Sequence, residues 1–149
     1  MSTIEAKTEA LKKSKAEEFA TACPSRVIEM ALEDLEAMEN DERYYVDMGA
    51  WHYPGTAGKC AVYYAGSVIA NRLGVSPKGS YEPCDFNPAT ENRLTALNLF
   101  RTGMIDDGLH FIGPKLYMAD WRMTDYRENP DKFKAQMHAM AGMLKNHGL

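Results

Sequence analysis

The chain opens with a helix-forming stretch in which apolar residues are widely spaced. Residues 2–22 are dominated by Ala, Glu, Lys and Leu, which favour helix. The main apolar residues of this stretch are Ile4, Leu11, Phe19 and Ala20. A helix with so narrow an apolar face buries little of itself. We therefore predict a loosely attached N-terminal helix over residues 1–22 and a single helical domain over residues 23–149.

A second helix is predicted over residues 26–38, because apolar residues recur there with a period close to that of a helix. They are Val27, Ile28, Ala31, Leu32, Leu35 and Met38. Ser25 is the predicted N-cap, since its hydroxyl oxygen can accept a bond from a first-turn N–H. The other face is acidic and no basic residue occurs between residues 29 and 42. Its acids are Glu29, Glu33, Asp34, Glu36 and Glu39, followed by Asp41 and Glu42.

The middle of the chain is harder to assign from its pattern. Residues 43–48, RYYVDM, have the character of a short strand or extended piece. After a loop rich in Gly and Pro, the chain is apolar on nearly every face from Cys60 to Leu73. Such a run is typical of a helix inside a bundle, and Gly74 would end that helix. The alternative is a strand at residues 60–65, CAVYYA, because a short apolar run fits either element.

Two later helices carry the same start signal, an Asn followed by a Pro. Asn87 and Asn129 are the predicted N-caps, because Pro suits the first helical position directly after the cap. Gly103 ends the first of these helices and Gly148 ends the second. Together, the elements predict an all-α protein, with five to six helices around the central apolar helix and a possible short β piece at residues 43–48.

Composition places the chain among ordinary globular proteins. It has 149 residues, 45% of them hydrophobic, and a net charge of -4, which suits one domain and argues against a general nucleic-acid binder. No apolar run is long enough for a membrane span, and the N-terminus has no apolar signal core. We expect a cytoplasmic protein. Its cysteines, Cys23, Cys60 and Cys84, lack metal-ligand spacing, so we expect them reduced, with no metal or cofactor.

Cys60 is the candidate nucleophile. If a helix begins there, the helix dipole and the neighbouring Lys59 lower the pKa of the thiol. His52 or His110 would then act as the base. The competing interpretation is a small buried residue in a packed core, where free Cys usually lies. We favour the buried interpretation and keep a small cysteine-dependent enzyme as the alternative function.

Two features suggest a binding surface. The acidic row would meet a basic partner, although a solvated face also explains such a run. The C-terminal third is rich in Trp, Tyr and Met, which binding surfaces favour and which core packing also uses; Met143 is among those expected at the surface. The binding candidates are Glu33, Glu36, Trp51, Tyr117, Trp121 and Met143.

A sparse pattern of residues supports a family resemblance over residues 43–103. The pattern comprises Asp47, Met48, Trp51, Cys60, Ala65, Gly66, Leu73 and Gly74. On these residues the chain resembles small uncharacterised proteins of bacteriophages and bacteria. Where those proteins often carry a second Cys, this chain has Tyr63 and Tyr64, which argues against a metal or paired-thiol site. The resemblance implies a helix-rich fold and an accessory role, and no reaction. We expect a phage-type accessory protein that binds a host or viral protein, for example as an inhibitor, or that self-associates.

Overall fold

The protein is mainly helical, with one small sheet. The structure is a computed structural model that describes residues 3–47, 50–55, 58–114 and 116–149. The helices of this described part are α1 (Thr3–Ala20), α2 (Pro24–Glu39), α3 (Tyr64–Arg72), α4 (Pro88–Phe100), α5 (Ile105–Ile112) and α6 (Pro130–Asn146), with a short 3-10 turn at Pro83–Asp85. The strands are β1 (Tyr44–Val46), β2 (His52–Pro54) and β3 (Cys60–Val62). The predicted helical class and the β piece within residues 43–48 are confirmed.

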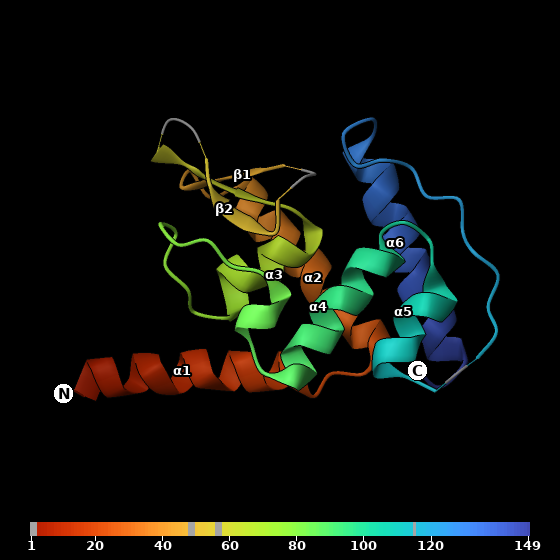
Figure 1. Cartoon of the computed structure of the whole chain (residues 1–149), viewed down its shortest axis with the longest axis horizontal. Coiled ribbons are helices and arrows are strands. Elements are labelled where there is room, and N and C mark those ends of the chain that lie inside the picture. Colours follow the sequence, from red (N-terminus) through yellow and green to blue (C-terminus); the bar gives the residue numbers. More distant parts are fainter. Residues whose placement is uncertain (1–2, 48–49, 56–57, 115) are drawn as a thin grey trace.

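Helix α2 forms the centre of the fold. It packs against α3, α4 and α6 (Figure 1). The apolar stripe predicted for it is buried, and ten of its sixteen residues lie in the interior. Two details differ from the sequence prediction. The helix begins at Pro24, so Ser25 is not its N-cap; the Ser25 hydroxyl instead donates to the carbonyl of Leu149. Asp34, assigned to the acidic outer face, is fully buried.

The predicted helix starting at Cys60 is wrong, and the alternative of a strand is confirmed for Cys60–Val62. β3 is the middle strand, parallel to β1 and antiparallel to β2. Its backbone groups bond to strands on both sides, which leaves only the second half of the apolar run to form α3. That helix ends where predicted, because Gly74 directly follows its last turn with a φ of +68°.

Both Asn–Pro starts are confirmed. The Asn87 side chain accepts a hydrogen bond from the Thr90 N–H, and the Asn129 side chain accepts one from the Lys132 N–H. Each bond satisfies a first-turn donor that has no partner inside the helix. Gly103 follows α4 with a φ of +82°.

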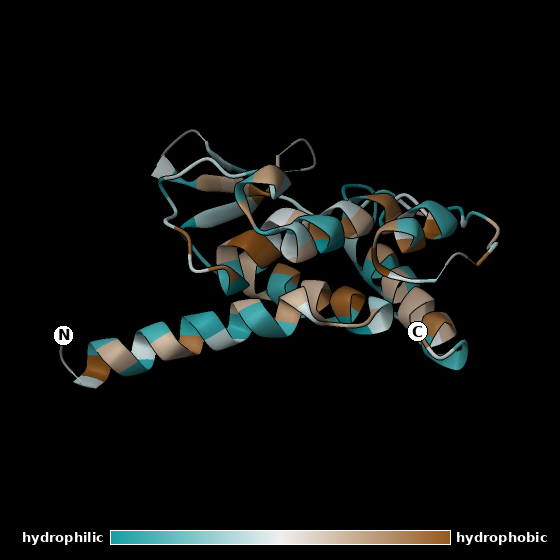
Figure 2. Cartoon of the chain, turned by 60° about the horizontal axis from the view of Figure 1, so that its bottom comes forward, coloured by the Kyte–Doolittle hydropathy of each residue, from teal (hydrophilic) through white to brown (hydrophobic). Residues whose placement is uncertain are grey.

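Helix α1 projects from the body of the molecule (Figure 1). Its outer part is largely hydrophilic (Figure 2), and the apolar side chains there are exposed, Ile4 by 78% and Leu11 by 58%. Phe19, near its C-terminal end, is fully buried in the main core. Within the described ranges, no helix combines the length and the apolar character needed to cross a bilayer.

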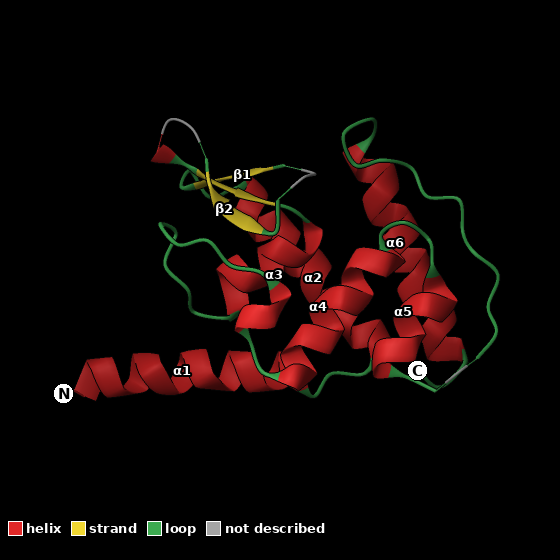
Figure 3. Cartoon of the chain, viewed as in Figure 1, coloured by secondary structure: helices red, strands yellow, loops and turns green. Residues whose placement is uncertain are grey.

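A long segment links α5 to α6 along the outside of the helices, and its described residues form no helix or strand (Figure 3). Hydrogen bonds to neighbouring elements fasten it. The Trp121 N–H donates to the Gly103 carbonyl, the Thr124 N–H to the Gln136 side chain, and the Tyr126 hydroxyl to Glu39. The segment therefore lies against α4, α6 and the end of α2.

Candidate functional site

The outer face of the sheet presents two tyrosines on either side of a small residue. In the strand register, Tyr45 of β1 and Tyr53 of β2 both pair with Ala61 of β3. Because side chains alternate along a strand, these three share one face, and Cys60 and Val62 turn to the buried face. The alanine leaves space between the two rings.

A cavity of about 600 Å³ opens on this face. We call it the sheet pocket, and its rings and carboxylates are those of Tyr45, Trp51, Tyr53, Tyr81, Asp47 and Glu82. Two glycines leave space for the rings of Tyr45 and Tyr81, which pack against their backbone. An ideal Cβ on Gly55 would lie 2.2 Å from the Tyr45 hydroxyl oxygen, and one on Gly79 would lie 2.5 Å from the Tyr81 ring. The described lining includes no Lys or Arg side chain; His52 also lines the pocket, and burial lowers the pKa of its imidazole.

Cys60 and His52, which the sequence analysis proposed as a nucleophile and its base, lie next to each other on the buried side of the sheet, where His52 also lines the pocket. The Cys60 sulfur is 3.4 Å from His52 Nδ1 and 3.8 Å from Nε2. His52 Nδ1 is also 2.9 Å from the Gly79 carbonyl oxygen, which can only accept, so Nδ1 carries the proton. The thiol lies 3.4 Å from the Tyr53 carbonyl and donates to it. Only the more distant Nε2 is left as a base.

The electrostatics of this pair differ from those predicted. Cys60 does not stand at a helix start, and burial raises the pKa of its thiol. Burial also lowers the pKa of His52, which the rings of Tyr44 and Tyr81 approach edge-on. The predicted lowering of the Cys60 pKa is therefore wrong. His110, the other candidate base, is exposed on α5 and is not among the hydrogen-bond partners of Cys60.

Two smaller hollows adjoin the sheet pocket through shared lining residues, and we call the three together the groove. Ala50 and Trp51 separate the sheet pocket from a hollow of about 140 Å³ beside Gly66 of α3. Tyr63 and Arg101 in turn separate that hollow from a cleft of about 320 Å³. We call this last part the arginine cleft; it is lined by Tyr63, Arg101, Thr102, Met123, Asp125 and Arg127.

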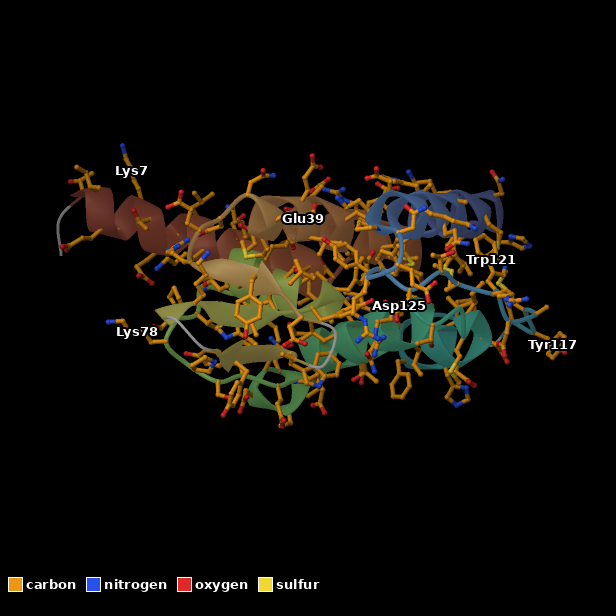
Figure 4. The ribbon with its side chains drawn as sticks, turned by 90° about the horizontal axis from the view of Figure 1, so that it is seen from above. Lys7, Glu39, Lys78, Tyr117, Trp121 and Asp125 are labelled. Atoms are coloured by element: carbon orange, nitrogen blue, oxygen red, sulfur yellow. The ribbon has the colours of Figure 1, made fainter. Side chains whose placement is uncertain are left out.

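The arginine cleft is built around one stacked guanidinium. Arg101 lies over the Tyr63 ring, 4.6 Å from its centroid, and its Nε donates to the Asn98 side chain at 2.7 Å. Arg127 forms an ion pair with Asp125 at 3.0 Å. Figure 4 shows Asp125 near the middle of the upper face, with Lys78 toward one end of the molecule and Tyr117 at the other. The charged residues of the two ends of the groove differ. The sheet pocket is lined by the carboxylates of Asp47 and Glu82, whereas the arginine cleft is lined by Arg101 and by the Arg127–Asp125 pair.

Much of the acidic row is paired with basic side chains, from α2 itself and from other segments. Glu33 pairs with Arg26 and Arg72, at 3.1 and 2.7 Å. The buried Asp34 accepts from Asn71 and Arg72, both at 2.7 Å, and burial still raises its pKa to about 6 against these bonds. Glu36 is exposed.

The remaining binding candidates are scattered. Trp51 lines both the sheet pocket and the hollow beside α3. Tyr117 is 92% exposed, at the far end from the sheet. Trp121 and Met143 are half-buried against the main core, so Met143 does not stand free on the surface as expected. Met48, part of the family pattern, lies outside the described residues.

Sequence reasoning missed most of the groove. Tyr45, Tyr53 and Tyr81 were not selected, and neither was Arg101. The spacing of Tyr45 and Tyr53 within their strands becomes informative only once the strand register is known. The contact of Arg101 with Tyr63 joins residues 38 positions apart, and nothing local in the sequence signals it.

Among the described residues, no group of three or more His, Cys, Asp and Glu side chains lies close enough to hold a metal ion. Comparison of the chain with protein-family models, with curated proteins and with solved structures finds no match. The groove is therefore the feature from which a function has to be argued.

Proposed function

We propose that this protein is a binding protein that holds an extended segment of a partner protein in the groove. The observation that carries the proposal is the position of Trp51, which lines both the aromatic sheet pocket and the neighbouring hollow that Arg101 also lines. Trp, Tyr and Arg are the residues that dominate binding energy at protein interfaces. Here they are contributed by separate segments to adjoining hollows.

The charges at the groove's ends define the partner's orientation. Asp47 and Glu82 attract a basic group at the sheet end, whereas Arg101 attracts an acidic group at the other. Such complementarity selects partners and fixes the register of a bound segment. The resemblance to small phage and bacterial proteins agrees with this role, so we propose a phage-type accessory protein that binds a host or viral protein.

The geometry of Cys60 gives little support to the alternative of a cysteine-dependent enzyme. The thiol is 1% exposed, its pKa is raised by burial and it donates to a backbone carbonyl. Thiolate, the nucleophilic form, is therefore disfavoured. We infer that Cys60 and His52 support the floor of the sheet pocket.

Selection from a random peptide library, followed by NMR titration, tests the proposal. The two tryptophan indole N–H signals make a built-in comparison, because Trp51 lines the groove and Trp121 does not. We expect selected peptides to shift the Trp51 signal and leave that of Trp121 in place.

Two exposed tyrosines provide matched variants for the same titration. Tyr53 is 61% exposed in the sheet pocket, and Tyr117 is 92% exposed at the far end. Tyr53→Ser should weaken peptide binding about tenfold, the loss typical of a ring that anchors an interface. Tyr117→Ser should leave it unchanged. The proposal fails if no peptide is selected, or if both variants lose binding equally.

A further inference from the structure

We propose that the sheet pocket binds an alkylammonium cation, such as the head of a methylated lysine side chain of the partner. This inference rests on the proposed function and adds the chemistry of one subsite to it. It starts from the lining of the pocket, in which one Trp ring, three Tyr rings and two carboxylates surround a cavity with no Lys or Arg among its described residues. The remaining basic side chain of the lining, His52, is buried, and burial lowers its pKa and so favours the neutral form.

The rings supply the attraction for a cation. The face of an aromatic ring carries partial negative charge, so a cation gains energy over Trp or Tyr, and alkylated ammonium groups gain it without losing strong hydration. Tyr45 and Tyr53 stand on either side of Ala61, and Trp51 and Tyr81 come from the flanking loops. The four rings, held at separate positions along the chain, therefore line one space that a cation can enter.

The carboxylates of Asp47 and Glu82 make the electrostatic potential in the pocket negative. Glu82 is held at the rim by a reciprocal capping arrangement, in which its N–H donates to Asp85 and its carboxylate accepts from the Asp85 N–H. Asp47, directly after β1, also lines the pocket. A carboxylate of fixed position favours a cation and disfavours an anionic ligand by repulsion.

The size of the pocket fits a side-chain head. A cavity of about 600 Å³ is within the usual range for small-ligand sites. Trp51 also lines the neighbouring hollow, so an extended chain that carries the cation can run past it along the groove. A free quaternary amine such as choline presents the same chemistry, and the experiment separates these two sources.

Titration with a capped trimethyl-lysine and with its uncharged analogue, in which carbon replaces the nitrogen, tests the inference. The two probes have the same shape and differ in charge. We expect saturable binding of the cation, reported by the Trp51 indole signal with Trp121 as reference, and about tenfold weaker binding of the carbon analogue. Equal affinity for the two probes would overturn the inference.

Variants separate the contributions of ring and charge. Tyr53→Phe keeps a ring and should retain cation binding, whereas Tyr53→Leu should lose about tenfold. Glu82→Gln should weaken the cation and leave the carbon analogue unaffected. Glu9→Gln, on the exposed outer part of α1 and outside the pocket lining, is the matched charge control and should change neither.

The outcomes distinguish this inference from the proposed function. If library peptides bind in the groove but the two probes bind equally, the proposed function is supported and the cation subsite is contradicted. If neither peptides nor probes bind, both fall. If choline binds as tightly as a peptide carrying trimethyl-lysine, the cation subsite stands and a free amine is its ligand.

Discussion

At the scale of the residue, Cys60 shows how one assignment of secondary structure decides a chemical conclusion. At a helix start, it would be an activated thiol. In the central strand it faces the interior, next to His52 and Tyr44, and it is shielded from solvent. The residue types near Cys60 are the same in both cases, and the direction of its pKa shift is opposite.

The three thiols should therefore differ in reactivity. Cys23 and Cys84 are exposed and Cys60 is buried. We expect iodoacetamide near neutral pH to modify the two exposed thiols, and Cys60 only after denaturant is added, because attack requires an accessible thiolate. Mass spectrometry of peptide digests locates the label. Native-state labelling of Cys60 at the rate of the other two would contradict the buried geometry.

Asp34 predicts a pH dependence of stability. Its pKa is raised to about 6 in the folded protein, mainly by burial, from an ordinary value of 3.8. A carboxyl with a raised pKa binds its proton more tightly when folded, so its contribution favours folding below about pH 4 and is lost as the pH rises to 6. Across this window, the wild type should lose about 1–3 kcal/mol relative to Asp34→Asn.

Urea unfolding at pH 4, 5, 6 and 7 measures this difference for Asp34. Other titrating groups, His52 among them, contribute to both proteins and cancel in the comparison. The Asn substitution leaves Arg72 its ion pair with Glu33. Parallel stability curves for the two proteins would show that Asp34 keeps an ordinary pKa when folded.

At the scale of the element, α1 combines an exposed outer part with one buried anchor. Deleting residues 1–15 should shift the melting temperature by less than about 2 °C, because surface side chains contribute little. Phe19→Ala should instead cost about 3–5 kcal/mol, through loss of a fully buried ring. Thermal and urea unfolding measure both. A large loss of stability on deletion would mean that the outer part of α1 packs on the body.

Elements with local signals were predictable, and those defined by distant partners were not. The Asn87 and Asn129 caps lie within three residues of the N–H groups they satisfy. β3 is three residues long and depends on strands that begin sixteen and eight residues earlier. Periodicity does not separate a short buried strand from a buried helix, so Cys60–Val62 was assigned to the helix that follows.

At the scale of the whole molecule, the groove exists because a loop approaches a helix closely. An ideal Cβ on Gly66 of α3 would lie 1.5 Å from the carbonyl oxygen of Trp51. That neighbour is backbone, so a larger residue has to displace the loop that carries Trp51. Trp51 was selected from the sequence as a binding residue. Its neighbours in the groove depend on this long-range packing and were not selected.

Gly66→Ala should therefore destabilise the fold by about 1–3 kcal/mol and shift the Trp51 indole signal. Gly142→Ala is the matched control, because Gly142 lies within α6 and its added Cβ meets nothing within 4 Å. That change should be neutral or stabilising by up to about 1 kcal/mol, since Ala favours helix. Thermal unfolding measures the change in stability of both variants, and NMR spectra report the position of the Trp51 indole signal. An unchanged Trp51 signal in Gly66→Ala would contradict the close approach.

The segment between α5 and α6 also divides the molecule into two pieces that meet through packing, hydrogen bonds and ion pairs. A cut after Tyr117, which is 92% exposed, would separate α6 from the other helices. The α6 fragment would still hold the apolar face that contacts α2, and Trp121 would still reach Gly103. The two fragments, made as independent polypeptides, are thus candidates for reconstitution by complementation, and the groove offers a readout of reassembly because Arg101 and Arg127 would belong to different fragments.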